Sequence, residues 1–323
     1  MRILFFIESL STGGKERRLM ELILYLKKHT NVDVCLVLSE PEIGYPYVSE
    51  IDMQIHVIQR RLIKYDPLLF FKFYKIVKSF KPDIIHTWGR MTTFYALPTK
   101  LLLRKVLLTN LIANAHRKYK KFSLSNLFFY CDVLFSNVIL SNSQAGIKAY
   151  GLQNNKKTKL IYNGVRLERF NIHPDKEGIK KTLKIKTPYV IIMVASASKK
   201  KDYDLLLDVA KIIARRRDDV TFLGVGNGSE FERLNQRVEI EGISNVRLLG
   251  KREDVEQLCY LSDICLLFSP CEGISNAIIE YMALGKPVIT TDTKGGSVEI
   301  IEEGKSGFII PKNIENIANK IIE

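Results

Sequence analysis

The chain has 323 residues, of which 46% are hydrophobic and 26% are charged, and its formal net charge is +14. This length exceeds one typical α/β core and fits two domains of about 150 residues each. The sequence holds no low-complexity tract, no short repeat and no apolar run near the ~18 residues of a membrane span. Residues 1–8 are too short for a signal peptide and predict a first strand. We therefore expect a globular, cytoplasmic protein.

The cysteines indicate a reduced, intracellular protein without structural zinc. They form no Cys-x-x-Cys pair and fall mostly in predicted strands or helices. The five cysteines are Cys35, Cys131, Cys259, Cys265 and Cys271.

The excess positive charge lies entirely in the first half of the chain. Residues 1–160 contain 25 Lys and Arg against 11 Asp and Glu, whereas residues 161–323 contain 24 of each kind. Such asymmetry indicates an anionic partner for the first half, which could be nucleic acid, a phosphorylated substrate or an anionic membrane face. A general excess of surface lysine that keeps the protein in solution is the plainer alternative.

The first half alternates between strands and helices. Residues 2–7 predict a strand, 8–14 a loop with Gly13 and Gly14, and 15–28 a helix with apolar residues at helical spacing. Strand, glycine loop and helix outline a phosphate site, because glycine lets a ligand approach the backbone. The signal is weak alone, since neither a GxGxxG motif nor a Walker loop is present. Further strands are predicted at 32–38, 54–58, 83–88, 106–113, 138–140 and 159–162, and helices at 67–80 and 92–103.

Two segments of this half combine positive charge with apolar residues. The predicted helix 67–80 places Lys72, Lys75 and Lys78 along one edge, and residues 117–130 mix four cations with aromatic and leucine side chains. The second segment suits a membrane surface and equally a core helix with a solvated face. His116 lies just before it, near the carboxyl end of a strand, where ligands bind, although a single histidine is more often structural.

The second half repeats the alternation after a polar stretch. Residues 171–187 are charged, contain Pro174 and Gly178, and predict a linker, which gives domains at 1–170 and 171–323. Strands are predicted at 189–195, 220–225, 246–249, 264–268 and 288–290, and helices at 202–217, 229–241, 253–261 and from 275 or 276 to 283.

Residues 264–292 form a strand, a loop, a helix and a strand. Glu272 lies just before the helix and Glu280 about one turn inside it. Ligands bind where such loops leave the carboxyl ends of strands, and a helix N-terminus attracts diphosphate while carboxylates bind sugar hydroxyls. Spacing alone favours two solvated surface charges. Three lysines, Lys199 to Lys201, could neutralise a diphosphate, although solvated lysine runs are commoner. Together these groups fit a sugar nucleotide in a cleft between the halves.

The segment from Glu272 to Glu280 resembles the E-x7-E motif of retaining glycosyltransferases of glycosyltransferase family 4. Their GT-B fold has two Rossmann-like α/β/α domains that face a central cleft. Other segments resemble the same family in the same order, so the likeness spans essentially the whole chain. They are STGGKERR at 11–18, DIIHTWG at 83–89, LSNSQAGIKAYG at 140–151, IYNGVRLERF at 161–170, SKKKDYDLLLDVA at 198–210, RLLGKREDV at 247–255 and ALGKPVITTD at 283–292.

The resemblance implies two catalytic residues and a set of donor-binding residues. Glu272 would hold the hydroxyls of the donor sugar, and His116 would contact that sugar or position the acceptor. Glu280 would bind the nucleotide ribose and Lys201 the diphosphate. The other implied donor-binding positions are Gly13 and Gly14 near the phosphate, Ser196 and Lys200 in the lysine loop, Gly250, Lys251 and Arg252 beside the nucleobase, and the backbone N–H groups of Gly273, Ile274, Ser275 and Asn276.

Two positions depart from the family pattern. The family usually has an arginine five residues before the lysine, where this chain has Ser196, and the ammonium of Lys199 or Lys200 does not reproduce a guanidinium fork. The chain also ends at Glu323, before the helix with which GT-B enzymes usually cross back to the first domain, so we expect a truncated C-terminal end.

The resemblance implies transfer of a sugar from a nucleotide-sugar donor to a saccharide or lipid-linked acceptor, with retention, in cell-surface polysaccharide or lipopolysaccharide synthesis. We expect no cofactor, no metal, no nucleic acid, and peripheral contact with the anionic inner face of the cytoplasmic membrane. A nucleic-acid-binding protein would explain the charge but not the two glutamates. A noncatalytic nucleotide-sugar-binding or scaffold protein would explain Ser196, and an isomerase or phosphorylase of the same fold is a third alternative.

Overall fold

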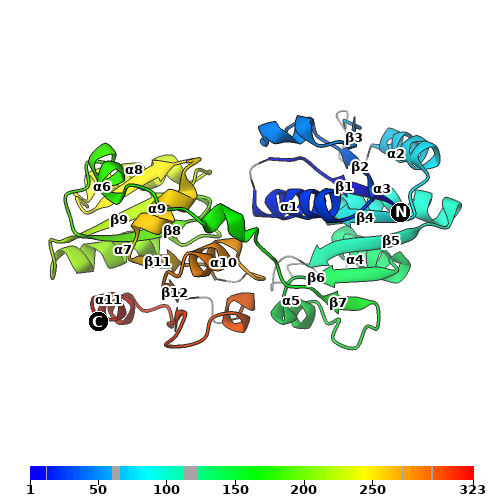
Figure 1. Cartoon of the computed structure of the whole chain (residues 1–323). Helices are drawn as coiled ribbons and strands as arrows, with labels where there is room; N and C mark the ends of the chain where they lie inside the picture. The colour runs from blue at the N-terminus through cyan, green and yellow to red at the C-terminus, as the bar shows by residue number, and fades with distance from the viewer. Residues whose placement is uncertain (12, 60–65, 113–122, 271, 292–293) are drawn as a thin grey trace. The chain divides into compact units, whose positions relative to one another are not determined.

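The computed structural model describes the chain apart from residues 12, 60–65, 113–122, 271 and 292–293 (Figure 1). The chain forms two compact units, which divide between Asn163 and Gly164. Each unit is a parallel sheet with helices packed on its faces, as the alternating pattern predicts. Among the described residues, no helix has the length and hydropathy needed to cross a membrane.

The first unit contains a seven-stranded sheet in the order β3-β2-β1-β4-β5-β6-β7. The central strands at 2–7 and 33–38 are buried apolar runs after their first residue, as parallel strands covered on both faces require. Its strands are β1 (Arg2–Ile7), β2 (Asp33–Leu38), β3 (Gln54–Val57), β4 (Ile84–Trp88), β5 (Val106–Ile112), β6 (Val138–Ser141) and β7 (Thr158–Leu160). Its helices are α1 (Gly14–His29), η1 (Pro46–Glu50), α2 (Pro67–Phe80), α3 (Arg90–Leu103), α4 (Leu124–Phe135) and α5 (Gln144–Ala149).

Strand β1 supplies both cores of this unit because successive side chains point to opposite faces of a sheet. Phe5 and Ile7 belong to the core that α1 covers, whereas Leu4 and Phe6 belong to the core beneath α2 and α3. The ring of Phe6 stacks on Phe73 of α2, with centroids 4.7 Å apart.

The second unit contains a six-stranded sheet in the order β10-β9-β8-β11-β12-β13. Ile191 and Met193 of β8 face the core under α7, and Val190 and Ile192 face the core under α9 and α10. Its strands are β8 (Tyr189–Val194), β9 (Val220–Val225), β10 (Val246–Gly250), β11 (Ile264–Leu267), β12 (Val288–Thr290) and β13 (Gly307–Ile309). Its helices are η2 (Leu167–Phe170), α6 (Lys176–Thr182), α7 (Tyr203–Ala214), α8 (Phe231–Ile240), α9 (Val255–Leu261), α10 (Asn276–Ala283), η3 (Gly296–Glu299) and α11 (Ile314–Ile322).

The interpretation of residues 171–187 as a linker is wrong for residues 176–182, which form a helix. Helix α6 forms inside it, and Ile179 and Leu183 pack against the second unit's core. Ile185, beyond the helix, is also buried. The charged composition hid these few apolar side chains, which are enough to attach a short helix to a core.

Strand order reverses once in each sheet, and this reversal positions the site. The order runs outward from β8 through β9 and β10 on one side, and from β11 through β12 and β13 on the other. Loops that leave β8 and β11 therefore diverge and open a crevice at their carboxyl ends. The equivalent reversal in the first unit lies between β1 and β4.

Candidate active site

Two predicted site residues meet at the strand-order reversal of the second unit. Lys201 follows β8 and Glu272 follows β11, and these strands are hydrogen-bonded neighbours. Nζ of Lys201 donates a hydrogen bond to Oε1 of Glu272, and only 15% and 20% of the two side chains are exposed. Partial burial strengthens the attraction over that of a surface pair. The reversal thus carries one cation and one carboxylate in direct contact.

The loop that carries Lys201 is fixed by backbone hydrogen bonds. The N–H of Ala197 donates to the carbonyl of Asn227 at 3.2 Å, and the N–H of Lys201 donates to Ser198 at 2.8 Å. The N–H of Asp202 donates to the carbonyl of Phe268, beyond β11, at 2.8 Å. Asp202 then caps α7 by accepting from the N–H of Leu205. These bonds hold Lys201 beside the loop of Glu272.

Gly226 brings the loops after β8, β9 and β10 together. Its φ of +135° suits glycine, and a Cβ there would collide with the carbonyl of Ala195. Its N–H donates to the carbonyl of Gly250 at 2.8 Å. Gly226 therefore lies between the loop of Ser196 and Gly250. It was not predicted as a site residue, although its position directly after a strand could have indicated such a role.

Ser196, at the position where the family usually has an arginine, and the nearby Lys199 and Lys200 all have exposed side chains. The Oγ of Ser196 lies 3.2 Å from Oγ of Ser198. Lys201, in contrast, is partly buried and paired with Glu272.

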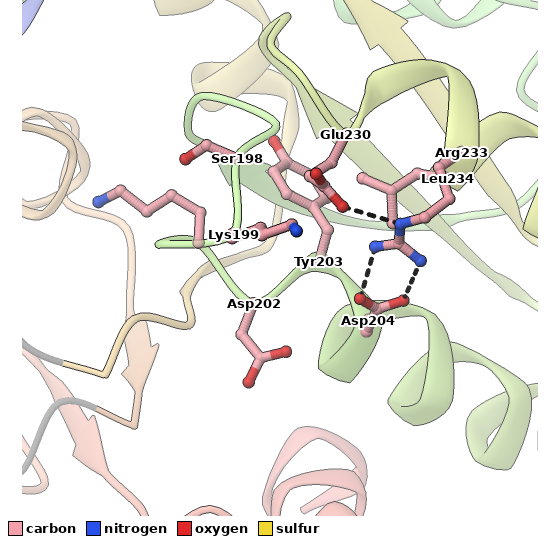
Figure 2. A pocket seen from close by; sticks show the side chains of 9 residues that line it. Ser198, Lys199, Asp202, Tyr203, Asp204, Glu230, Arg233 and Leu234 are labelled. Carbon is pink, nitrogen blue, oxygen red and sulfur yellow. Dashed lines mark hydrogen bonds and ion pairs between the residues drawn. The ribbon is translucent and has the colours of Figure 1, made fainter.

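A hollow of about 410 Å³ adjoins Lys201 (Figure 2). Figure 2 shows Arg233 of α8 between two carboxylates. The guanidinium donates to Glu230 at 2.9 Å and to Asp204 at 3.0 and 2.7 Å, so the carboxylates of this protein neutralise its charge. The hollow is lined by Ser198, Lys199, Lys201, Asp202, Tyr203, Asp204, Glu230, Arg233 and Leu234.

Helix α10 places Glu280 on its buried side. Ser275 is the N-cap residue but makes no side-chain cap hydrogen bond, and Glu280 is only 8% exposed. Nη1 of Arg169, in η2, lies 3.7 Å from Oε1 of Glu280. Gly273 and Ile274, whose N–H groups were predicted to contact the donor, are buried just before the helix.

The predicted nucleobase loop follows β10. Gly250 has a φ of +64°, and Lys251 is exposed. The guanidinium of Arg252 donates two hydrogen bonds to Asp254, at 2.8 and 2.7 Å. These bonds hold the pKa of Asp254 below its usual value. Arg252 is thereby held within its own loop.

Comparison with known proteins identifies the family. The family described as Glycosyltransferase Family 4 matches residues 12–169, and the one described as Glycosyl transferases group 1 matches residues 175–323. The chain belongs to the family 4 glycosyltransferases of the GT-B fold.

Relatives of this glycosyltransferase span most of its length. It is 25% identical to a Campylobacter jejuni protein, N-acetylgalactosamine-N,N'-diacetylbacillosaminyl-diphospho-undecaprenol 4-alpha-N-acetylgalactosaminyltransferase, over 96% of this chain and 86% of that protein. It is 26% identical to the Escherichia coli UDP-Gal:alpha-D-GlcNAc-diphosphoundecaprenol alpha-1,3-galactosyltransferase, over 77% of this chain and 68% of the relative. Anabaena HepE in complex with UDP-glucose superposes with a TM-score of 0.84 at 23% identity, over 100% of this chain and 89% of HepE.

The first unit of the glycosyltransferase holds the predicted glycine loop at its own reversal. Gly13 is the N-cap residue of α1 and Gly14 begins the helix. The side chain of Glu16 folds back against Gly13, and Nζ of Lys15 lies 3.3 Å from Oε2 of Glu8. The loop after β1 thus also pairs a lysine with a glutamate.

His86, in the segment that resembles the family's His-x-Trp, is a core residue. It is 5% exposed, and its ring centroid lies 5.4 Å from that of Phe5 and 5.3 Å from that of Trp88. Burial lowers its pKa to about 3, so the imidazole is neutral near pH 7. This histidine supports the fold of β4.

Several predicted positions lie outside the described residues. They include His116, the second predicted catalytic residue, and Cys271. The basic part of the 117–130 segment is outside as well. Its described part is α4, in which Phe129 is buried and Tyr130 is exposed. Placement of His116 in the active site stays a prediction.

Proposed function

We propose that this glycosyltransferase transfers a sugar from a UDP-sugar to a saccharide or lipid-linked acceptor and retains the anomeric configuration. The observation that carries the proposal is the contact between Lys201 and Glu272 where the strand order reverses. A cation for a diphosphate and a carboxylate for sugar hydroxyls stand there side by side. The complex of HepE with UDP-glucose and the UDP-Gal donor in the name of the E. coli relative support this choice of nucleotide.

The proposed reaction breaks the bond between the sugar's anomeric carbon and the diphosphate oxygen, whose electron pair leaves with the diphosphate. The acceptor hydroxyl oxygen forms the new bond to the same carbon on the same face, and its proton passes to the departing diphosphate oxygen. Negative charge grows on the departing diphosphate, and Lys201 stabilises it most in the transition state. Glu272 accepts hydrogen bonds from the sugar hydroxyls and so orients the carbon under attack.

We propose that the diphosphate is neutralised by protein groups and not by a metal ion. Lys201 and the N-terminus of α10 are the proposed groups, and a helix N-terminus favours negative charge. In the part of the chain that the structure describes, no three His, Cys, Asp or Glu residues gather in a way that could hold a metal.

We further propose that the first unit faces an anionic lipid surface that carries the acceptor in cell-surface polysaccharide synthesis. Its basic charge supports this, as do Phe71 of α2, Leu102 of α3 and Leu134 of α4, which are 66%, 73% and 65% exposed. Helix α3 packs against both α2 and α4, so these side chains belong to one layer of helices. The C. jejuni and E. coli relatives are named for acceptors on diphospho-undecaprenol.

A thermal-shift screen of nucleotide sugars, followed by product analysis, tests the donor and the reaction. UDP-sugars should raise the melting temperature more than GDP- or dTDP-sugars, and a transferred sugar should keep its anomeric configuration. Activity should persist in EDTA. Loss of activity in EDTA with recovery in Mg²⁺ or Mn²⁺ would overturn metal independence. Binding without turnover would favour the noncatalytic alternative, and an epimerised donor the isomerase.

A further inference from the structure

Arg169 contacts one glutamate on each of two helices, and one of these is Glu280, the residue expected to bind the nucleotide ribose. It lies in η2, and its Nη2 donates a hydrogen bond to Oε1 of Glu256 in the first turn of α9. Its Nη1 lies 3.7 Å from Oε1 of Glu280 in α10. The side chains of Arg169, Glu256 and Glu280 are only 13%, 23% and 10% exposed. One cation therefore lies between two carboxylates in a mostly buried position.

The contacts of the guanidinium with the two glutamates differ in kind. The contact with Glu256 is a hydrogen bond, which fixes the direction of the guanidinium plane. At 3.7 Å, the contact with Glu280 exceeds the hydrogen-bond range of about 2.7–3.2 Å, so it is an electrostatic attraction and not a hydrogen bond. Glu256 anchors the arginine, and the arginine attracts Glu280.

A buried carboxylate depends strongly on such a partner. Removing one member of a buried pair leaves the other with an uncompensated charge in a poorly solvated place. Glu280 would then move toward solvent and lose its alignment. A lysine could balance part of the charge but could not face both carboxylates with one planar fork.

We propose that Arg169 is a positioning residue for the nucleotide subsite, which holds the Glu280 carboxylate in place to accept hydrogen bonds from the ribose hydroxyls. This inference rests on the proposed function, because it takes a UDP-sugar as the donor, and on the role in ribose binding that the family resemblance implies for Glu280. In this proposal Arg169 acts on the ligand through Glu280, so its effect depends on the hydroxyls being present on the ligand.

Calorimetric titration of the full chain with UDP and with 2′,3′-dideoxy-UDP tests this dependence. Arg169→Ala should weaken UDP binding about tenfold and leave binding of the dideoxy compound unchanged, because the lost interaction involves the ribose hydroxyls. Arg169→Lys should recover part of the loss. In the Glu280→Gln background, Arg169→Ala should weaken UDP no further. In turnover, the donor KM should rise while kcat stays within about twofold.

Arg216→Ala is the matched control, because Arg216, just after α7, pairs with Glu315 in the first turn of α11 and should leave UDP affinity unchanged. If Arg169→Ala does not fold, the binding of UDP and dideoxy-UDP is compared in Glu256→Gln, which removes the carboxylate charge that holds Arg169. Equal weakening of UDP and dideoxy-UDP, or additive losses with Glu280→Gln, would overturn the inference. Wild type that does not bind UDP would overturn the proposed function with it, whereas wild-type binding that Arg169→Ala leaves intact would overturn the inference alone.

Discussion

At the scale of single residues, the central feature is that Lys201 and Glu272 neutralise each other. Under the proposed function, a bound donor would replace Glu272 as the partner of the lysine, because a diphosphate carries the greater charge. Glu272 would then be released toward the sugar. The ion pair thus keeps two partly buried charges compatible with a folded, ligand-free protein.

Substitution of the two glutamates should separate catalysis from donor binding. Glu272→Ala should lower kcat about 100-fold or more, because the lost group acts on the sugar in the transition state. Glu280→Ala should chiefly raise the donor KM, about tenfold, because a ribose contact is similar in the ground and transition states. Steady-state kinetics with a UDP-sugar would measure both. Glu239→Ala, an exposed change on α8, is the control, and near-normal turnover by Glu272→Ala would contradict the assignment.

At the scale of elements, local signals predicted most of the fold. Helix α2 begins and ends as predicted because Asp66 caps it, Pro67 opens it and Lys81 ends it in a left-handed conformation. Helix α6 was missed because its few apolar residues lie among charges. The contact of Lys201 with Glu272 depends on which strands are neighbours, and the contact of Arg169 with Glu280 on tertiary packing. Local patterns contain neither kind of information.

Helices α7 and α8 are joined by a network of ion pairs that gives a test by pH. Arg237 contacts Asp204 and Glu241, and Lys211 contacts Glu241. Hydrogen bonds from Arg237 and Lys211 lower the pKa of Glu241 from 4.5 to about 2. A carboxylate whose folded pKa is depressed stabilises the protein above its unfolded pKa, and this stabilisation is lost as pH falls toward the folded pKa.

We therefore expect Glu241→Gln to loosen α8 at pH 7 and to differ progressively less from wild type between pH 4.5 and pH 2. Amide hydrogen exchange of α8, compared with wild type at each pH, would measure this. Glu239→Gln is the control on the same helix, because no ion pair of Glu239 occurs among the described residues. A difference between Glu241→Gln and wild type that persists unchanged at pH 2 would show that the ion pairs are not its cause.

At the scale of the whole molecule, the uneven charge follows the division into two units. The net charge of +14 lies in residues 1–160, whose Lys, Arg, Asp and Glu residues all belong to the first unit, and the rest of the chain is balanced. On α2, the exposed side chains of Leu68, Phe71, Lys75 and Lys78 recur at helical spacing, so apolar and basic groups share one face. Such a face suits the boundary between lipid headgroups and acyl chains.

The last prediction is that the protein binds anionic vesicles through this unit. Each exposed Lys or Arg near an anionic surface contributes about 1 kcal/mol, so a patch of several gives reversible attachment. Co-sedimentation should therefore require anionic lipid and should fall as salt rises, because free charges are screened over about 8–10 Å.

Charge reversal at Lys72, Lys75 and Lys78 should weaken vesicle binding, and reversal at Lys118, Lys120 and Lys121 in the 117–130 segment should weaken it further. The matched control reverses Lys181, Lys184 and Lys186, which are exposed in the second unit and change the net charge equally. Equal loss of vesicle binding in the control would mean that binding depends on the net charge of the protein and not on a basic surface of the first unit. If the wild-type protein does not bind anionic vesicles and glycosylates a water-soluble acceptor equally well, the prediction of membrane binding is wrong. The basic residues then form only a solvated surface.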